Sequence, residues 1–392
     1  GGDASHRVCY AMAMCVAGLA AYAFGFNLLP DRYSMVQAVK AEDRGELQRW
    51  RTLGIRMSVM GVGIAGIVLA LLGPSALEGG YAGTESESLG INLLLRGSSV
   101  FITAGLATTC VASFGLRRKL LAIGWIPLLL YLGYMAGFSI HGDRYVLFSF
   151  ALIGACAYAE RVRPLSPLML VLAAALGIAA FTVIGVARVS PERTLPSMYR
   201  TYMRHYDDVR ADTAVLTTAV QIQSLFAASA WVPEKHDFYH GKMAALDALG
   251  LVPFAARLPL VQRAFHGTEQ YEKNSSHLLT WLVVGHFESG GKATTSVANF
   301  FLDFGLLGVV IGMGLQGVFC KYIQQKSRET GRVMMGCSYC FLLPVMGYSQ
   351  RASFISQLGA HLMWPLFVMF VLASIMGVMQ SRRGTVKTGG MS

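Results

Sequence analysis

Residues 121–138 read LAIGWIPLLLYLGYMAGF, and none of these side chains carries a charge. An α-helix rises about 1.5 Å per residue, so a run of this length reaches most of the way across about 30 Å of hydrocarbon. A segment inside lipid must satisfy its own backbone hydrogen bonds, and a helix does so. The stretch is therefore predicted to be a membrane-spanning helix.

Similar apolar blocks recur along the chain, in which 54% of residues are hydrophobic and only 14% are charged. Ordinary soluble domains have about 25% charged residues, and the mean hydropathy of +0.48 points the same way. The blocks predict an all-α, polytopic bundle of transmembrane helices with one large helical outer loop. The nine predicted spans are Val8–Leu29, Leu53–Gly73, Gly97–Phe114, Leu121–Phe138, Tyr145–Ala159, Leu168–Ala187, Val297–Phe319, Val333–Tyr348 and Leu358–Val378.

The net charge of +11 reflects basic loops that alternate with loops poor in cations. Cytoplasmic loops of membrane proteins carry excess Lys and Arg, so the charge predicts no nucleic-acid partner. This positive-inside rule places the N-terminus outside the cytoplasm and the C-terminus in the cytoplasm. No cleavable signal peptide precedes the first span, and the chain begins at Gly1-Gly2 without methionine, so we expect that a preceding span is missing from this numbering. The basic loops contain Arg32, Lys40, Arg44, Arg49 and Arg51; Arg117, Arg118 and Lys119; Arg161 and Arg163; Lys321, Lys326, Arg328 and Arg332; and Arg382, Arg383 and Lys387.

One connection is much longer than the others, and it gives the predicted domain division. Residues 1–187 form a six-span membrane region, residues 188–296 form an extracytoplasmic loop domain, and residues 297–392 form a three-span region with a cytoplasmic tail. Residues 214–231 are uncharged but rich in Thr, Gln and Ser. They predict an amphipathic or re-entrant helix at the membrane-facing side of the loop domain.

The long loop opens with closely spaced arginines and tyrosines. Arg200 and Arg204 lie four residues apart on a helix predicted to begin near Ser197, and like charges at this spacing repel unless an anion lies between them. Guanidinium groups suit phosphate oxygens, and tyrosine rings offer flat surfaces to a sugar. The alternative is a solvated helix whose arginines have no ligand. The tyrosines of the stripe are Tyr199, Tyr202 and Tyr206.

Three further arginines lie at predicted outer ends of spans, where the positive-inside rule disfavours them: Arg144, Arg188 and Arg351. Together they could clamp the diphosphate of a lipid substrate. Each could instead extend to lipid headgroups.

The loop also holds six of the nine histidines. His236 and His240 have a spacing that binds zinc on some helices, but the H-E-x-x-H order is absent and Gly241 weakens a helix there, so we expect no metal. His286 and Glu288, shortly before the seventh span, are the predicted general base for a sugar hydroxyl.

Several other classes of chemistry lack sequence support. The chain has neither a Walker-type phosphate loop nor a dinucleotide glycine motif, so no nucleotide cofactor is expected. Asp303 is the only charged residue deep in a predicted span, whereas proton-coupled transporters usually have more. The seven cysteines, Cys9, Cys15, Cys110, Cys156, Cys320, Cys337 and Cys340, are predicted to be buried thiols.

The segment 288–308, ESGGKATTSVANFFLDFGLLG, resembles the segment that closes the long outer loop of Wzy-type O-antigen polymerases, the oligosaccharide repeat unit polymerase family. The turn at Gly142-Asp143-Arg144 and the arginine at Arg351 are similar to arginine positions of that family. The resemblance covers the layout of the whole chain, although here only one long outer loop exists and family members often have two.

The resemblance implies a metal-independent glycosyltransferase of the bacterial inner membrane that needs no cofactor. Its donor and acceptor would both be undecaprenyl-diphosphate-linked oligosaccharides among membrane lipids, and a chain-length regulator protein is a candidate partner. An O-antigen ligase, which transfers glycan to lipid A-core, is the nearest alternative. Ligases have a histidine at the start of the span after the loop, where this chain reads Thr294-Thr295-Ser296-Val297. A flippase or other transporter of lipid-linked glycans is the second alternative.

Overall fold

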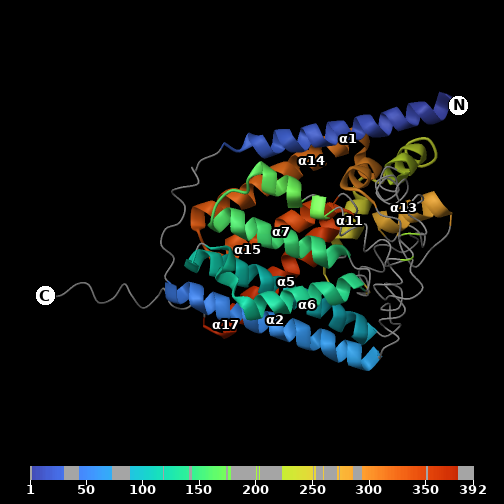
Figure 1. The fold of residues 1–392 in the computed structure, drawn as a ribbon. Helices are drawn as coiled ribbons and strands as arrows, with labels where there is room; N and C mark the ends of the chain where they lie inside the picture. The colour runs from blue at the N-terminus through green and yellow to red at the C-terminus, as the bar shows by residue number, and fades with distance from the viewer. Residues whose placement is uncertain are drawn as a thin grey trace. The chain divides into compact units, whose positions relative to one another are not determined.

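All regular secondary structure in the described part of the chain is helical, as predicted. The computed structural model describes residues 2–30, 44–72, 89–117, 119–140, 144–173, 175–177, 200, 203, 223–249, 251–252, 259, 272, 274–285, 294–349 and 352–377. In chain order (Figure 1) the elements are α1 (Gly2–Leu28), α2 (Arg44–Leu72), α5 (Leu89–Arg117), η1 (Leu120–Ile123), α6 (Trp125–Ile140), α7 (Arg144–Arg161), α11 (Lys242–Leu249), α13 (Ser275–Val284), α14 (Ser296–Thr330), α15 (Val333–Tyr348), α16 (Phe354–Leu358), η4 (Gly359–Met363) and α17 (Trp364–Ile375).

Within these described residues, five helical stretches are long and apolar enough to cross a membrane: His6–Leu28, Arg44–Leu72, Leu93–Arg117, Ser296–Thr330 and Phe354–Ile375. Three shorter apolar helices cover Trp125–Gly137, Pro167–Gly177 and Val333–Tyr348. The protein is therefore a multi-pass membrane protein, and the predicted count of nine spans is not confirmed.

Several helices extend beyond the apolar blocks from which they were predicted. α2 begins at Arg44 rather than Leu53 because its first turns carry arginines, whose long side chains can reach headgroups while the backbone stays helical. The predicted span Leu121–Phe138 is instead divided between η1 and α6. Gly124 separates the two with a φ of 91°, which glycine adopts readily.

The chain divides into two compact units: Gly1–Arg32, His205–Gln325 and Val345–Leu362 form unit 1, and Tyr33–Arg204, Lys326–Pro344 and Met363–Ser392 form unit 2. Both units group segments that are distant in sequence. The three-part division made from the sequence stays a prediction.

Small residues allow α2 and α5 to pack closely in unit 2. A Cβ atom added to Gly54 would lie 2.6 Å from Oγ1 of Thr109, and one added to Gly61 would lie 2.9 Å from the backbone N of Ile102. A Cβ on Gly105 would lie 2.7 Å from the carbonyl O of Gly54. Small residues at such contacts are typical of helix pairs in lipid, where van der Waals packing replaces the hydrophobic effect.

Buried polar groups join further helices of unit 2. The Tyr131 hydroxyl of α6 lies 2.7 Å from the Ser58 hydroxyl of α2 and donates to Oγ1 of Thr109 on α5 at 3.1 Å. At the end of α7, Nη2 of Arg161 donates to the carbonyl O of Gly331 at 3.0 Å. These bonds satisfy polar side chains that would otherwise be costly to bury.

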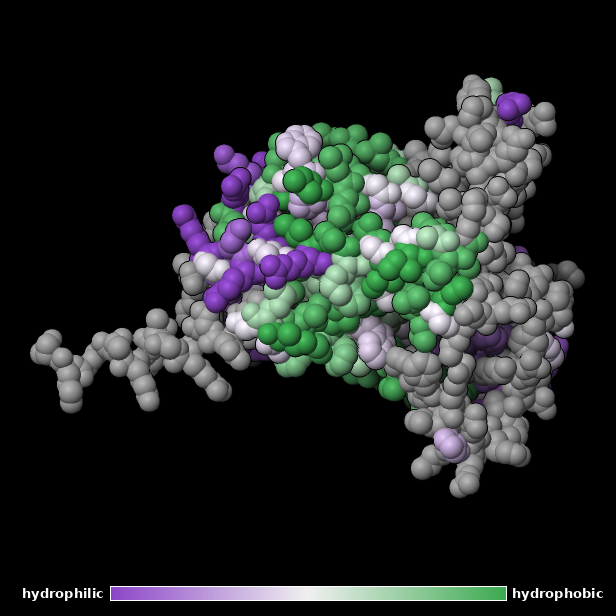
Figure 2. Space-filling model, turned by 90° about the horizontal axis from the view of Figure 1, so that it is seen from below, coloured by the Kyte–Doolittle hydropathy of each residue, from purple (hydrophilic) through white to green (hydrophobic). Residues whose placement is uncertain are grey.

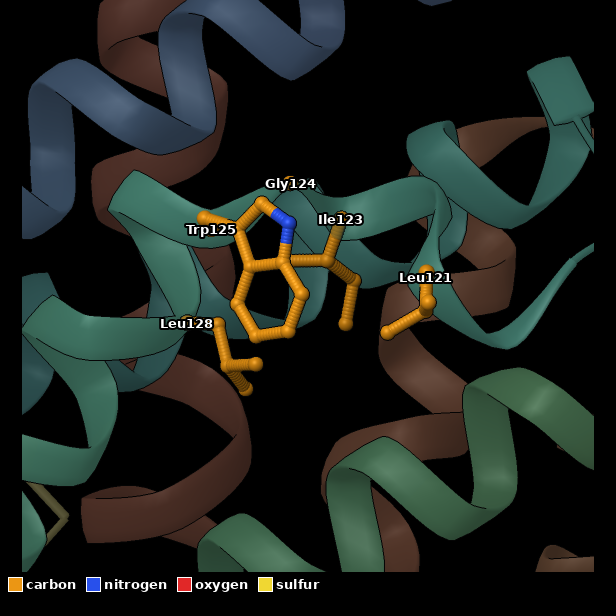
Figure 3. Close-up of a pocket in the computed structure, with 5 residues that line it drawn as sticks. All are labelled: Leu121, Ile123, Gly124, Trp125 and Leu128. Carbon is orange, nitrogen blue, oxygen red and sulfur yellow. The ribbon is translucent and has the colours of Figure 1, made fainter.

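Exposed apolar side chains are abundant on α6 of unit 2. Ile126 is 79% exposed and Trp125 is 69% exposed, as expected for surface that contacts lipid. Figure 2 shows hydrophobic side chains over much of one face, with hydrophilic side chains gathered at one end of it. An apolar pocket at the η1–α6 corner (Figure 3) is lined by Leu121, Ile123, Gly124, Trp125 and Leu128. Its lining carries no titratable side chain, so it offers no catalytic group.

In unit 1, α1 and α14 run in the same direction side by side (Figure 1). Near their starts, Arg7 pairs with Glu234 of the long connection at 3.1 Å. Near their ends, Nε2 of Gln325 donates to the carbonyl O of Pro30 at 2.6 Å. Residues 223–231 are helical, within the segment predicted to be amphipathic or re-entrant, and Leu225 and Ala228 are buried in the core of this unit.

The cysteine prediction is confirmed for five of the seven residues, which are buried free thiols. Cys9 and Cys15 on α1 are exposed instead. A residue on an apolar helix can face lipid as well as a protein core, so the apolar pattern alone does not distinguish the two environments.

Candidate functional site

α14 is broken close to its start, in unit 1. Phe304 and Gly305 leave helical geometry, with φ/ψ of −142°/19° and 62°/−150°. The carbonyl groups of Leu302 and Asp303 consequently accept hydrogen bonds from the backbone N–H groups of Tyr239 and His240, each at 3.0 Å. The long connection thus binds directly to the opened helix and satisfies its backbone, as irregular backbone in a membrane protein requires.

Glycine is required at the break. The φ of 62° at Gly305 is unfavourable for residues with a side chain. A Cβ atom there would also lie 3.0 Å from Cζ of Phe238, which comes from the long connection. The sequence pattern did not predict this break, because glycine also occurs at many unbroken positions of the predicted spans.

Asp303 is buried beside the break and caps α11. Its carboxylate oxygens accept hydrogen bonds from the backbone N–H groups of Met243 at 3.0 Å and Ala244 at 2.9 Å. The first N–H groups of a helix have no partner within the helix, and a carboxylate at that end also interacts favourably with the helix dipole. Asp303, which the sequence marks as a charged residue deep in a predicted span, therefore joins the start of α11 to the break in α14.

A second buried carboxylate, Asp247, joins four segments of unit 1. Its Oδ2 accepts hydrogen bonds from Oγ of Ser275 on α13 at 2.9 Å and from Nδ2 of Asn299 on α14 at 2.6 Å. The Ser353 side chain, which precedes α16, also hydrogen-bonds to it. Burial raises the pKa of the Asp247 carboxyl above its usual range, and these hydrogen bonds oppose the increase.

Ser349 and Ser353, each two residues from Arg351, both make hydrogen bonds. Both the backbone N–H and the hydroxyl of Ser296 donate to the carbonyl O of Ser349, each at 2.9 Å. The Ser353 side chain accepts a hydrogen bond from the backbone N–H of Ser356 at 3.4 Å and caps α16. Arg351 itself lies outside the described residues; Ser349 is hydrogen-bonded to Ser296 of α14, and Ser353 is hydrogen-bonded to Asp247.

Most predicted site residues fall outside the described part of the chain: Arg188, Arg204, Arg351, His286, Glu288, Tyr199, Tyr202 and Tyr206. Of the others, Arg144 is the first residue of α7, and Arg200 is helical and exposed. His286 directly follows Gly285, which ends α13 in the left-handed conformation. The arginine clamp, the tyrosine stripe and the general base all stay predictions.

The two histidines with zinc-like spacing do not lie on one helix. His240 has a φ of 49°, and Gly241 after it has a φ of 90°, so the chain turns sharply before α11 begins. Among the described residues, no group of three or more His, Cys, Asp or Glu side chains could hold a metal ion.

The sequence did not predict the Asp247 joint, the buried hydrogen bonds between Asp247 and the side chains of its three partners. A single Asp in a loop has no recognisable pattern, and its partners Ser275, Asn299 and Ser353 are far apart in the chain. Asp303 did stand out in the sequence, because it is a charged residue deep in a predicted span.

A protein-family model matches the chain. It is described as O-antigen polysaccharide polymerase Wzy and matches residues 125–382, which is more than half of the chain and includes the break in α14 and the Asp247 joint. No curated protein and no solved structure matches the chain.

Proposed function

Because the chain belongs to the Wzy family of O-antigen polysaccharide polymerases, we propose that it transfers one polyprenyl-diphosphate-linked glycan onto another at the outer face of the bacterial inner membrane. Family membership makes it a multi-pass polymerase of lipid-linked oligosaccharide repeat units. The side of the membrane, the identity of the carrier lipid and the residues involved are parts of the proposal.

The observation that carries the proposal is the docking of the long connection onto the broken start of α14. The substrate has a lipid tail in the bilayer and a glycan in water, so its diphosphate lies near the membrane surface. A loop domain fixed to a spanning helix through Asp303, Tyr239 and His240 can hold the glycan while the spans hold the lipid. A site of this kind suits a substrate that is part lipid and part sugar.

The proposed reaction is a displacement at the anomeric carbon of the donor. A hydroxyl oxygen of the acceptor glycan bonds to that carbon, and its proton passes to His286 or Glu288. The bond between the anomeric carbon and the diphosphate oxygen breaks, and its electron pair leaves with the lipid diphosphate. No nucleotide is consumed, because the energy comes from the bond that breaks.

Arginines would stabilise the departing diphosphate. Charge-assisted, bidentate hydrogen bonds from guanidinium groups suit phosphate oxygens, and charges fixed in advance contribute strongly to transfer reactions. The fixed positions of Ser349 and Ser353 support Arg351 as one such group. The proposed clamp comprises Arg188, Arg144, Arg204, Arg200 and Arg351, and the proposed sugar contacts are Tyr199, Tyr202 and Tyr206.

The test is polymerisation by the purified protein with a synthetic lipid-diphosphate repeat unit, in the presence of EDTA. We expect a ladder of products that differ by whole repeat units. Transfer only onto lipid A-core would instead indicate a ligase, and lipid movement across liposomes without new glycosidic bonds would indicate a transporter.

For the clamp, Arg188→Ala and Arg188→Lys should each reduce the rate of chain extension by about 100-fold, a loss typical of one stabilising donor. Lys119→Ala, which removes a cation from the predicted cytoplasmic side, is the matched control and should extend chains at the normal rate. Normal extension by both Arg188 variants would remove this residue from the clamp.

A further inference from the structure

Three aromatic rings of the long connection form a nearly parallel layer in unit 1. The His236 imidazole stacks on the Tyr239 ring with centroids 4.4 Å apart and an interplanar angle of 11°. It is also within 14° of parallel to Trp231, at 6.0 Å. Nε1 of Trp231 donates to the Tyr239 hydroxyl at 3.2 Å, and Trp281 of α13 stands edge-on to Trp231 at 5.7 Å.

A carboxylate with two nitrogen groups lies beside this layer. Nζ of Lys242 donates to Oε2 of Glu272 at 2.6 Å, and the Tyr239 hydroxyl donates to Oε1 at 3.3 Å. Nε2 of His236 lies 4.0 Å from the same Oε1. The Glu272 side chain is only 9% exposed, whereas those of His236 and Lys242 are 38% and 33% exposed. The carboxylate is therefore set deep, and an imidazole and an ammonium group reach the surface above it.

We propose that the partly exposed side chains of His236 and Lys242, supported by Trp231, the buried Tyr239 and Glu272, form a saccharide-binding subsite that receives one sugar ring of the repeat-unit glycan. This inference rests on the proposed function and assigns a location to part of the substrate. A sugar ring has apolar C–H faces and a rim of hydroxyl groups. Aromatic side chains match the faces, and charged hydrogen-bonding groups match the rim.

The charge balance favours a sugar over the diphosphate. Glu272 offsets Lys242 within hydrogen-bonding distance, so the cluster has no surplus of positive charge to neutralise a diphosphate. A buried carboxylate would repel one, whereas it accepts hydrogen bonds readily from sugar hydroxyls.

The subsite is rigidly attached to the break in α14. The Tyr239 N–H binds the carbonyl of Leu302, and Lys242 begins the helix that Asp303 caps. A ring bound here would keep a fixed distance to the spanning part of α14, as a donor or acceptor glycan must while its lipid end stays in the bilayer. Preorganised contacts of this kind favour binding because little freedom is lost when the ligand arrives.

Two probes distinguish binding of the glycan from binding of the lipid diphosphate. The first is O-polysaccharide released from lipopolysaccharide by mild acid, and the second is undecaprenyl diphosphate without sugar. We expect the purified protein to bind the first with a change in tryptophan fluorescence that is lost in Trp231→Phe. His236→Ala and Glu272→Gln should each weaken glycan binding about tenfold, as the loss of one charge-assisted hydrogen bond or stacked ring does. Neither exchange should change the affinity for undecaprenyl diphosphate.

Lys235→Ala, an exposed neighbour outside the aromatic layer, is the matched control and should bind both probes normally. Unchanged glycan affinity in both His236→Ala and Glu272→Gln, or an equal loss of affinity for both probes, would overturn the subsite. If Glu272→Gln unfolds, the glycan affinity of the His236→Ala variant, whose side chain is only half-buried, decides whether the subsite exists. The polymerisation assay is run on the wild-type protein in parallel. If the wild type makes the ladder and His236→Ala binds glycan normally, only the subsite is wrong. If the wild type makes no ladder, the proposed function is wrong.

Discussion

The Asp247 carboxyl group links α11 to α13, to α14 and to the residue before α16. Its titration should therefore change the free energy of unfolding with pH. Burial raises its pKa in the folded state, so the protonated form is favoured there. Its contribution to stability is greatest below the ordinary carboxyl pKa of about 4 and is lost as the pH rises through the folded-state pKa.

Asp247→Asn should therefore remove a pH-dependent part of the stability. An amide oxygen can still accept from Ser275 and Asn299 but never becomes charged. We expect the variant to gain stability relative to the wild type as the pH rises from about 4 to about 8. Thermal unfolding in detergent over this range measures the difference, with the exposed Asp237→Asn as control. A wild-type to variant difference that is constant with pH would show that Asp247 does not titrate as inferred.

The capping role of Asp303 can be tested by a single substitution. Its two carboxylate oxygens accept hydrogen bonds from the N–H groups of Met243 and Ala244. The amide of Asp303→Asn has one acceptor oxygen, so one N–H at the start of α11 loses its partner. We expect the free energy of unfolding to fall by about 1–3 kcal/mol. Backbone hydrogen exchange should also become faster at Met243 and Ala244. Wild-type exchange at both positions would contradict the capping role.

At the scale of elements, the contact between α2 and α5 depends on glycine. In Gly105→Leu, the new side chain would meet the backbone of α2 and force the two helices apart, at a cost of about 3 kcal/mol. Gly66→Leu, on an exposed part of α2 where a Cβ atom meets nothing within 4 Å, is the control. Thermal unfolding of both variants in detergent gives the comparison. Equal melting temperatures would mean that the close approach contributes nothing to stability.

The elements were largely predictable because apolar blocks of the right length mark helices in lipid. α15 has the predicted bounds, Val333–Tyr348. The ends of α2 and α14 were not predictable, because a helix can continue into the headgroup region on charged residues. The break at Phe304–Gly305 also escaped prediction, since it depends on partners in residues 239–244 that only the folded chain brings near.

At the scale of the whole molecule, the proposal requires the long connection and the basic loops to lie on opposite sides of the membrane. In a background without the exposed Cys9 and Cys15, we expect Lys235→Cys to react with a membrane-impermeant maleimide in intact spheroplasts. Lys119→Cys should react only after permeabilisation. Labelling of Lys235→Cys only after permeabilisation would place the loop in the cytoplasm and end the proposed function.

The candidate site was less predictable from sequence than the fold. Asp303 stood out because a charge inside an apolar run is costly, so a single sequence suffices to notice it. Glu272 lies in a polar stretch where acidic residues are ordinary, and Asp247 is a single acidic residue in the mostly apolar run of α11. The burial of both carboxylates follows only from contacts with α13, α14 and Lys242. The pairing of distant polar residues is a tertiary property that local patterns do not encode.

The interruption in α14 has a consequence for how the protein tolerates different lipids. From Gly305 to Cys320 the helix carries no charge, and at 1.5 Å per residue this stretch is about 24 Å long, less than a bilayer core of about 30 Å. The tilt of such a helix is set by its packing against neighbouring helices. Because the preceding turn is held by α11 rather than by a continuous helix, tilting below Gly305 need not rotate the residues above it. A change in bilayer thickness would thus alter the slope of this helix, while the residues bonded to α11 keep their own geometry.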